Sequence, residues 1–249
     1  MASAFIDTTM KPTTMPEPST TAHASEHPTP LDEPAARRRG TALCLSGGGY
    51  RAALFHLGAV RRLNELGILA RLDTVSGVSG GSILANLLAD PRLDFEAGRA
   101  TDGDGMVGGF DDFVSGPLRE LASRNVRTPA LLSKLKPWRW FADSVAVTAM
   151  ADELAQTVTW WSKPLRDNDV AGPAVVTGAT EIGYGVDWVF EDPAAHRPHG
   201  RVGDYRLGYA APPKGIRMAD MVAASCAFPP FFGPKVLDGV AMGLTGGHP

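Results

Sequence analysis

Gly77-Val78-Ser79-Gly80-Gly81 is the most informative motif of this chain. It lies between a short apolar segment, residues 72–75, and an apolar stretch with helical spacing, residues 83–88. A serine on a tight strand-to-helix turn points its hydroxyl away from its own backbone, and flanking glycines give the turn room and backbone freedom. We therefore predict a nucleophile elbow with Ser79 as the nucleophile and Gly77, Gly80 and Gly81 as its glycines. The alternative is a turn that needs small residues for packing alone.

A second apolar segment, residues 42–45, runs into a loop with three glycines, Gly47, Gly48 and Gly49, and then into a helix-like segment. Three consecutive glycines let backbone N–H groups converge on one point, and the positive end of the next helix adds to the field there. Such a loop is typical of a phosphate cradle or of an oxyanion hole. The phosphate patterns fail, because no Gly-Lys-Ser/Thr follows and Ala52 stands where a dinucleotide fingerprint has its third glycine. Arg51 fits a contact with a phosphate headgroup or an ion pair near the helix start.

The two loops follow the same local plan. The pattern predicts strands at 42–45 and 72–76 and helices at about 50–66 and 81–89, which is an α/β alternation with parallel strands. Both loops then lie at the carboxyl ends of parallel strands, where open α/β sheets gather their ligand sites. This placement favours an oxyanion hole beside Ser79.

Residues 45–53, 55–59 and 73–82 together resemble the patatin-like phospholipase family, and residues 223–232 resemble the small-residue and proline segment before its catalytic aspartate. The resemblance implies a three-layer α/β/α fold with a mainly parallel central sheet and an inserted helical segment. It also implies a Ser-Asp dyad, a glycine loop that serves as the oxyanion hole, a phospholipid or other lipid ester as substrate, and no cofactor.

The aspartate of that dyad normally stands in an Asp-Gly-Gly or Asp-Gly-Ala motif. The nearest candidate is Asp238, which is followed by Gly239 and Val240 and comes eight residues after Pro230. We interpret Asp238 as a turn residue. Residues 241–249 have the pattern of an interrupted loop, so we expect that the chain is truncated and that the aspartate lies beyond its end.

A classical triad would need a histidine after the nucleophile. His196 and His199 lie in a polar loop broken by prolines, and His248 is one residue from the end. His56 precedes Ser79 in the first predicted helix, where we interpret it as a packing or surface residue. The triad is therefore the weaker hypothesis.

The composition of the chain bears on its class of function and on its kind of domain. Net charge is −3, and the largest basic run is residues 37–39, which gives no electrostatic case for nucleic acid. Cys44 and Cys226 are the two cysteines, and we expect both to be buried, reduced thiols. They form no metal pattern, so we predict no metal site. A hydrophobic fraction of 44% and a charged fraction of 20% are typical of a globular domain.

The chain divides into a Thr/Pro-rich tail, residues 1–39, which we expect to be disordered, and one domain, residues 40–249. Neither a signal peptide nor a transmembrane stretch is evident, so the default location is cytoplasmic, which is compatible with peripheral membrane contact.

Residues from about 111 to 161 are predicted to be mainly helical, inserted before a buried strand at 173–181. They carry four of the tryptophans, which would either form a lid or acyl-chain groove or belong to the core: Trp138, Trp140, Trp160 and Trp161. We favour the core.

The predicted function is hydrolysis of carboxylic esters of lipids, of the phospholipase, lysophospholipase or esterase type. Three alternatives stay open. They are a serine acyltransferase, a lipid-binding fragment without catalysis, and a nucleotide-binding domain that uses the glycine loop. The sequence does not indicate a protein partner.

Overall fold

The computed structural model describes residues 5–7, 40–100, 105–124, 145–165, 172–192, 200–213, 215–229, 232–242 and 244. Its centre is a sheet with the strand order β2-β3-β4-β5-β6-β7, to which β1 and β8 are added. The strands are β1 (Phe5–Asp7), β2 (Ala42–Leu45), β3 (Thr74–Val78), β4 (Ala174–Glu181), β5 (Val186–Glu191), β6 (Arg201–Asp204), β7 (Gly208–Ala210) and β8 (Lys235–Val236).

The sheet is mixed. β2, β3 and β4 are parallel neighbours, with Leu45 opposite Gly77 and Val78 opposite Gly178. β1 pairs in parallel with β4 beyond the end of β3, and β8 pairs in parallel with β1. β5, β6 and β7 extend the sheet as antiparallel strands. The predicted α/β class is confirmed, and the parallel part of the sheet holds both glycine-rich turns.

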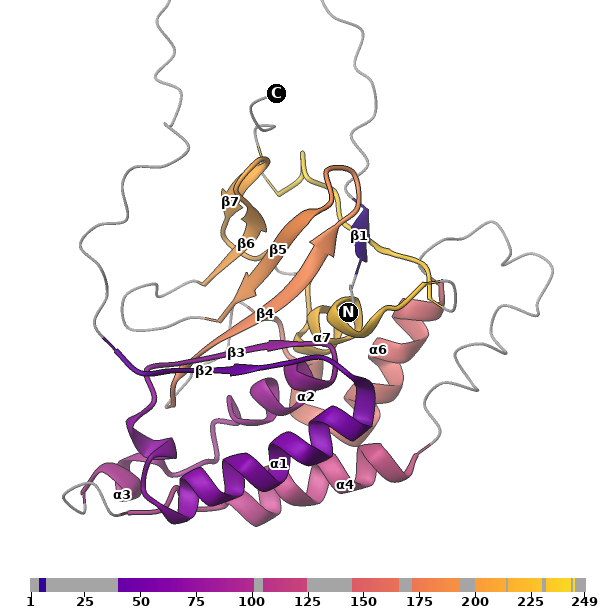
Figure 1. Ribbon diagram of the computed structural model, residues 1–249. Coiled ribbons are helices and arrows are strands. Elements are labelled where there is room, and N and C mark those ends of the chain that lie inside the picture. The colour runs from indigo at the N-terminus through magenta and orange to yellow at the C-terminus, as the bar shows by residue number, and fades with distance from the viewer. Residues whose placement is uncertain are drawn as a thin grey trace, which may run out of the picture.

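Helices follow the parallel strands. They are α1 (Gly49–Glu65), α2 (Gly80–Leu87), α3 (Phe95–Ala100), α4 (Gly116–Ser123), α6 (Val145–Thr157) and α7 (Met218–Cys226), with a π-helical turn at Asp111–Ser115 and 3₁₀ turns at Leu69–Arg71 and Thr159–Ser162. In Figure 1, α1, α2 and α4 lie together on one side of β2 and β3, and α6 lies at the end of this group, beside α7. The two glycine-rich corners therefore turn toward the same group of helices.

The core forms where these helices meet the sheet. α1 buries Ala53, Leu57, Val60 and Asn64, which recur at helical spacing along one face, while Phe55 on the other face is 75% exposed. α2 is buried along its whole length. A helix that is surrounded on all sides cannot shift easily, so the residue at its N-terminus is held in a fixed place.

Several sequence predictions are confirmed. The strands at 42–45 and 173–181 and the first two helices occur within one or two residues of the predicted bounds. Gly67, at φ 66°, follows the end of α1 as expected, and its N–H donates to the carbonyl of Asn64 at 2.9 Å.

Other predictions differ from the structure. Residues 91–110 contain the short helix α3, although their Gly and Asp content predicted a loop. Phe5–Asp7, inside the Thr/Pro-rich tail, pair as β1 with two other strands, and the rest of that tail lies outside the described residues. The expectation of two buried thiols is wrong, because Cys44 is exposed on the terminal strand β2 and Cys226 is half-buried; neither of these two cysteines forms a disulfide.

Within the predicted helical segment, Trp160 and Trp161 are buried at 8% and 0% exposure, which supports the core interpretation for this pair. Trp138 and Trp140 lie outside the described residues. In the described part of the chain, every helix is too short or too polar to cross a bilayer.

Candidate active site

Ser79 occupies the sharp turn between β3 and α2. Its backbone lies at φ 53° and ψ −121°, and it is the single non-glycine residue of the described chain with a positive φ. This conformation costs an L-residue about 1–3 kcal/mol and persists only where the surroundings enforce it. The side chain is largely buried, at 9% exposure. A strained serine on a strand-to-helix turn has the backbone geometry expected of a nucleophile elbow.

Hydrogen bonds hold the backbone of Ser79 on both sides. Its carbonyl accepts from the N–H of Ser82 at 2.9 Å and from the Ser82 hydroxyl at 2.6 Å, so the first turn of α2 fixes this side. Its N–H donates to the hydroxyl oxygen of Ser225 in α7 at 2.9 Å. The N–H of Ser79 is therefore engaged and is not available to stabilise an oxyanion.

The glycine loop forms the corresponding turn after β2. Gly48 lies at φ 142° and Gly49 at φ 65°, conformations that favour glycine over any L-residue. α1 begins at Gly49 without a side-chain cap and without an acidic residue in its first turn. Backbone N–H groups at such a helix start lack intrahelical partners and form the positive end of the helix dipole. The loop thus offers donors for a negatively charged oxygen.

The two turns touch each other through their backbones. A Cβ atom on Gly80 would overlap the carbonyl of Gly49, and one on Gly81 would overlap the carbonyls of Leu45 and Ser46. A Cβ atom on Gly77 would come within 2.5 Å of the Gly81 carbonyl oxygen. Glycine is required at all three positions by close approach. Contact between the two helix starts places the turn of Ser79 directly beside the glycine loop.

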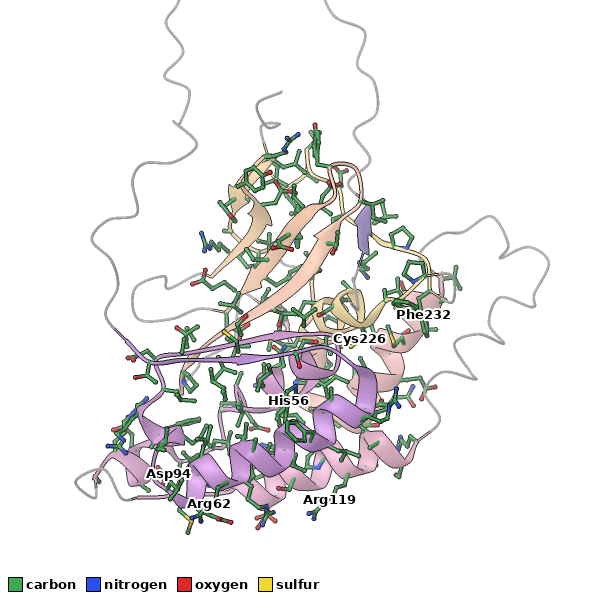
Figure 2. The ribbon with its side chains drawn as sticks, in the orientation of Figure 1. His56, Arg62, Asp94, Arg119, Cys226 and Phe232 are labelled. Carbon is green, nitrogen blue, oxygen red and sulfur yellow. The ribbon has the colours of Figure 1, made fainter. Side chains whose placement is uncertain are left out.

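His56 lies on α1 (Figure 2), and its ring reaches back to Ser46, the first residue after β2. Its Nε2 lies 3.0 Å from the carbonyl oxygen of Ser46 and 3.4 Å from the Ser46 hydroxyl. A carbonyl oxygen only accepts, so Nε2 carries a proton and donates it. His56 is therefore a partner of the loop backbone, which the interpretation as a packing or surface residue missed.

The planarity of the peptide bond links the direction of the Ser46 carbonyl to that of the Gly47 N–H. The carbonyl of Ser46 and the N–H of Gly47 belong to the same trans peptide and point in opposite directions. By holding that carbonyl, His56 also fixes the direction of the Gly47 N–H, which is the first donor of the loop.

Asp238 has the surroundings of a turn residue, as predicted. Its side chain is exposed, and one carboxylate oxygen accepts from the N–H of Ala241 at 3.0 Å. Its carbonyl accepts from the N–H of Met242 at 3.1 Å. Among the described residues, no carboxylate or imidazole is hydrogen-bonded to the Ser79 hydroxyl. His196, His199 and His248 lie outside the described residues.

Arg51 is exposed in the first turn of α1 and makes no ion pair with a described carboxylate. The guanidinium adds positive charge at a helix start that has no acidic residue. Groups of three or more His, Cys, Asp or Glu side chains placed to hold a metal ion do not occur among the residues that the structure describes.

Sequence reasoning missed Ser225 and His56 as partners of the two turns. Ser225 lies 146 residues from Ser79 in the sequence, whereas His56 lies 10 residues from Ser46. The available signal for Ser225 was its place in the segment 223–232, and for His56 its place in the segment 55–59. Neither segment identifies the partner atom.

Comparison with solved structures supports the fold. Human GIVD cytosolic phospholipase A2 in complex with methyl gamma-linolenyl fluorophosphonate matches with a TM-score of 0.50 at 18% identity, over 80% of this chain and 33% of that chain. The same enzyme with the inhibitor and terbium chloride gives a TM-score of 0.48 at 18% identity, over 80% and 34%. This chain thus spans about a third of the length of that phospholipase chain.

A chain from the complex of SpcU with ExoU, of the Pseudomonas aeruginosa type III secretion system, matches with a TM-score of 0.32 at 20% identity, over 78% of this chain and 39% of that one. No curated protein sequence matches. The family model described as patatin-like phospholipase matches residues 43–244, which include both glycine-rich turns and the segment with Ser225. The chain belongs to the patatin-like phospholipase family.

Proposed function

We propose that this protein hydrolyses carboxylic esters of lipids with Ser79 as the nucleophile. Lipid ester hydrolysis agrees with the family, whose model covers residues 43–244. The observation that carries the proposal is the backbone contact between the elbow and the glycine loop. It sets a strained serine next to uncapped helix-start amides, which are two of the components that acyl transfer to a serine requires, beside a base.

The proposed reaction has two halves. The Ser79 oxygen attacks the ester carbonyl carbon while its proton passes to a base, and the carbonyl oxygen becomes negative. Amides of Gly47, Gly48 and Gly49 donate to that oxygen. Collapse of the tetrahedral intermediate expels the alcohol, which takes the proton, and leaves an acyl-serine. Water then attacks the acyl-serine and releases the fatty acid.

The oxyanion hole is proposed to lie in the glycine loop. The N–H of Ser79 is engaged by Ser225, whereas the loop after β2 ends at an uncapped helix start. Losing one oxyanion donor typically raises the barrier by about 2.7–4 kcal/mol. Arg51, at the same helix start, is proposed to contact the phosphate of a phospholipid headgroup.

The base is proposed to be an aspartate, as in the family's dyad. Asp238 is a poor candidate because its carboxylate caps its own turn at the surface. Asp238→Asn tests this directly: unchanged hydrolysis assigns the role to another carboxylate, and loss of hydrolysis assigns it to Asp238.

The test of the proposed function is product analysis with a phospholipid and with a short soluble ester. We expect release of free fatty acid by the wild-type protein and loss of that release in Ser79→Ala, with an unchanged melting temperature. Addition of an alcohol acceptor separates hydrolysis from acyl transfer, because a transferase gives a new ester. Full hydrolysis by Ser79→Ala would overturn the proposal.

A further inference from the structure

Ser225 is a buried serine of α7, at 1% exposure, and is the neighbour of Cys226, which Figure 2 labels on that helix. Its hydroxyl oxygen lies 2.9 Å from the backbone nitrogen of Ser79 and 2.7 Å from the carbonyl oxygen of Gly178 in β4. One side chain thus connects the nucleophile's backbone to a strand of the sheet.

The donor and acceptor of both Ser225 hydrogen bonds follow from the groups involved. The N–H of Ser79 can only donate, so the Ser225 oxygen accepts from it, and the carbonyl of Gly178 can only accept, so the Ser225 hydroxyl proton goes there. The hydroxyl has one proton, and that proton is committed. Ser225 therefore holds the Ser79 N–H from a fixed orientation and does not take part in proton transfer at the site.

The elbow needs such a partner. At φ 53° and ψ −121°, the backbone of Ser79 would relax to a more favourable region if it were free to do so. The first turn of α2 holds the carbonyl of Ser79, and the hydroxyl of Ser225 holds its N–H. We propose that Ser225 is a positioning residue that keeps Ser79 in the strained, reactive conformation. The proposal rests on the function proposed above for Ser79.

α7 is itself firmly anchored, which makes it a suitable support. Asp220 in its first turn is buried and accepts hydrogen bonds from Arg217 at 2.9 Å and from Lys235 of β8 at 2.8 Å. Burial acts to raise the pKa of Asp220, but the hydrogen bonds and charges of these two cations outweigh it and lower the pKa. Asp220 is therefore charged and hydrogen-bonded to two cations, and it fixes the helix that carries Ser225.

Removal of the Ser225 hydroxyl would leave two backbone groups without that partner, the buried N–H of Ser79 and the partly buried carbonyl of Gly178. The peptide before Ser79 could then rotate and carry the nucleophile's oxygen away from the glycine loop. A displacement of about 1 Å in a reacting group can cost on the order of a hundredfold in rate. Substrate binding remote from the elbow would be unaffected.

The experiment compares Ser225→Ala, Ser225→Thr and a matched control, Thr177→Val. Thr177 is buried and accepts from Asn86 at 2.7 Å, so its replacement removes a buried hydrogen bond between α2 and β4 without touching Ser79. With a soluble ester, we expect Ser225→Ala to lower kcat by roughly 10- to 100-fold with KM within about twofold. Ser225→Thr keeps the hydroxyl and should recover most of kcat, and Thr177→Val should keep wild-type kcat.

Hydrogen exchange of the Ser79 amide gives a readout that does not need turnover. Loss of its protection in Ser225→Ala, with protection retained in Thr177→Val, supports the positioning bond. Wild-type kcat together with wild-type protection in Ser225→Ala overturns the inference. Absence of hydrolysis by the wild-type protein would instead refute the proposed function, and amide exchange would still decide whether Ser225 holds the elbow.

Discussion

The turn after β2 and the turn after β3 both join a parallel strand to a helix, and they touch each other, yet they support unusual backbone conformations by different means. The first uses glycine at its positive φ positions, Gly48 and Gly49. The second places a serine at φ 53° and holds its backbone by hydrogen bonds in which Ser82 donates to its carbonyl and Ser225 accepts from its N–H.

The two turns differ because one presents backbone groups and the other presents a side chain. A loop that presents backbone amides needs no side chain at its turn, so glycine supplies the conformation without strain. A nucleophile must have a side chain, so its turn must be enforced by neighbours. The loop should therefore be sensitive to added atoms, and the elbow to the loss of hydrogen-bond partners.

The largest expected effect comes from filling the contact between the turns. In Gly80→Ala, the new methyl group would overlap the backbone carbonyl of Gly49, which has no flexible side chain to move aside. We expect a loss of about 3 kcal/mol or more in the free energy of unfolding, measured by urea denaturation, together with loss of hydrolysis. A stable Gly80→Ala protein with wild-type turnover would show that the turns do not touch.

Gly48→Ala should have the next largest effect. The residue lies at φ 142°, and its Cβ atom would come 2.9 Å from the Cβ of Ala52. We expect a destabilisation of about 2 kcal/mol, with a fall in kcat. Gly58→Ala is the matched control, because Gly58 is in α1 with open space around it. Gly58→Ala should gain about 0.5–1 kcal/mol in the free energy of unfolding and keep its activity. Equal changes in stability and kcat in the two variants would refute the claim that the backbone conformation of Gly48 requires glycine.

His56 tests whether the loop, too, depends on a side-chain partner. His56→Phe removes the donor to the Ser46 carbonyl and should lower kcat about tenfold, the rate equivalent of one hydrogen bond. His56→Gln retains an N–H donor and should lose less. If Phe and Gln at this position give the same kcat, the imidazole has no role in orienting the loop.

The smallest effect measures strain at the elbow. Ser79→Ala and Ser79→Gly both remove the nucleophile, but only glycine tolerates φ 53° without cost. We expect Ser79→Gly to be more stable than Ser79→Ala by about 1 kcal/mol in thermal or chemical unfolding. The reverse order of stability would mean that the backbone at this position is relaxed.

The sequence predicted the two turns well because each is local. Glycines, a serine and the flanking apolar periodicity are all encoded within a few residues of one another, so β2, α1, β3 and α2 could be placed from the pattern. Short elements without strong periodicity were harder to predict. α3 lies in a Gly- and Asp-rich stretch, and Phe5–Asp7 form a strand by pairing with β4 and β8, which are far away in the sequence.

Tertiary partners could not be predicted in the same way. The bond from Ser79 to Ser225 depends on how α7 packs against β4, and the bond from His56 depends on the path of the loop before α1. Cys44 is exposed although its neighbours are apolar, because successive side chains of β2 point to opposite faces of the sheet and Cys44 lies on the face opposite to the buried Leu45. Position within the sheet, rather than local composition, decides such contacts.

The most direct test of the central claim is covalent labelling with a fluorophosphonate, followed by peptide mapping. Human GIVD cytosolic phospholipase A2 was solved with a reagent of this class. We predict that the wild-type protein gains one phosphonyl group, that the group maps to Ser79, and that Ser79→Ala gains none. Labelling of another residue, or no labelling of the folded wild-type protein, would contradict the assignment of Ser79 as the activated nucleophile.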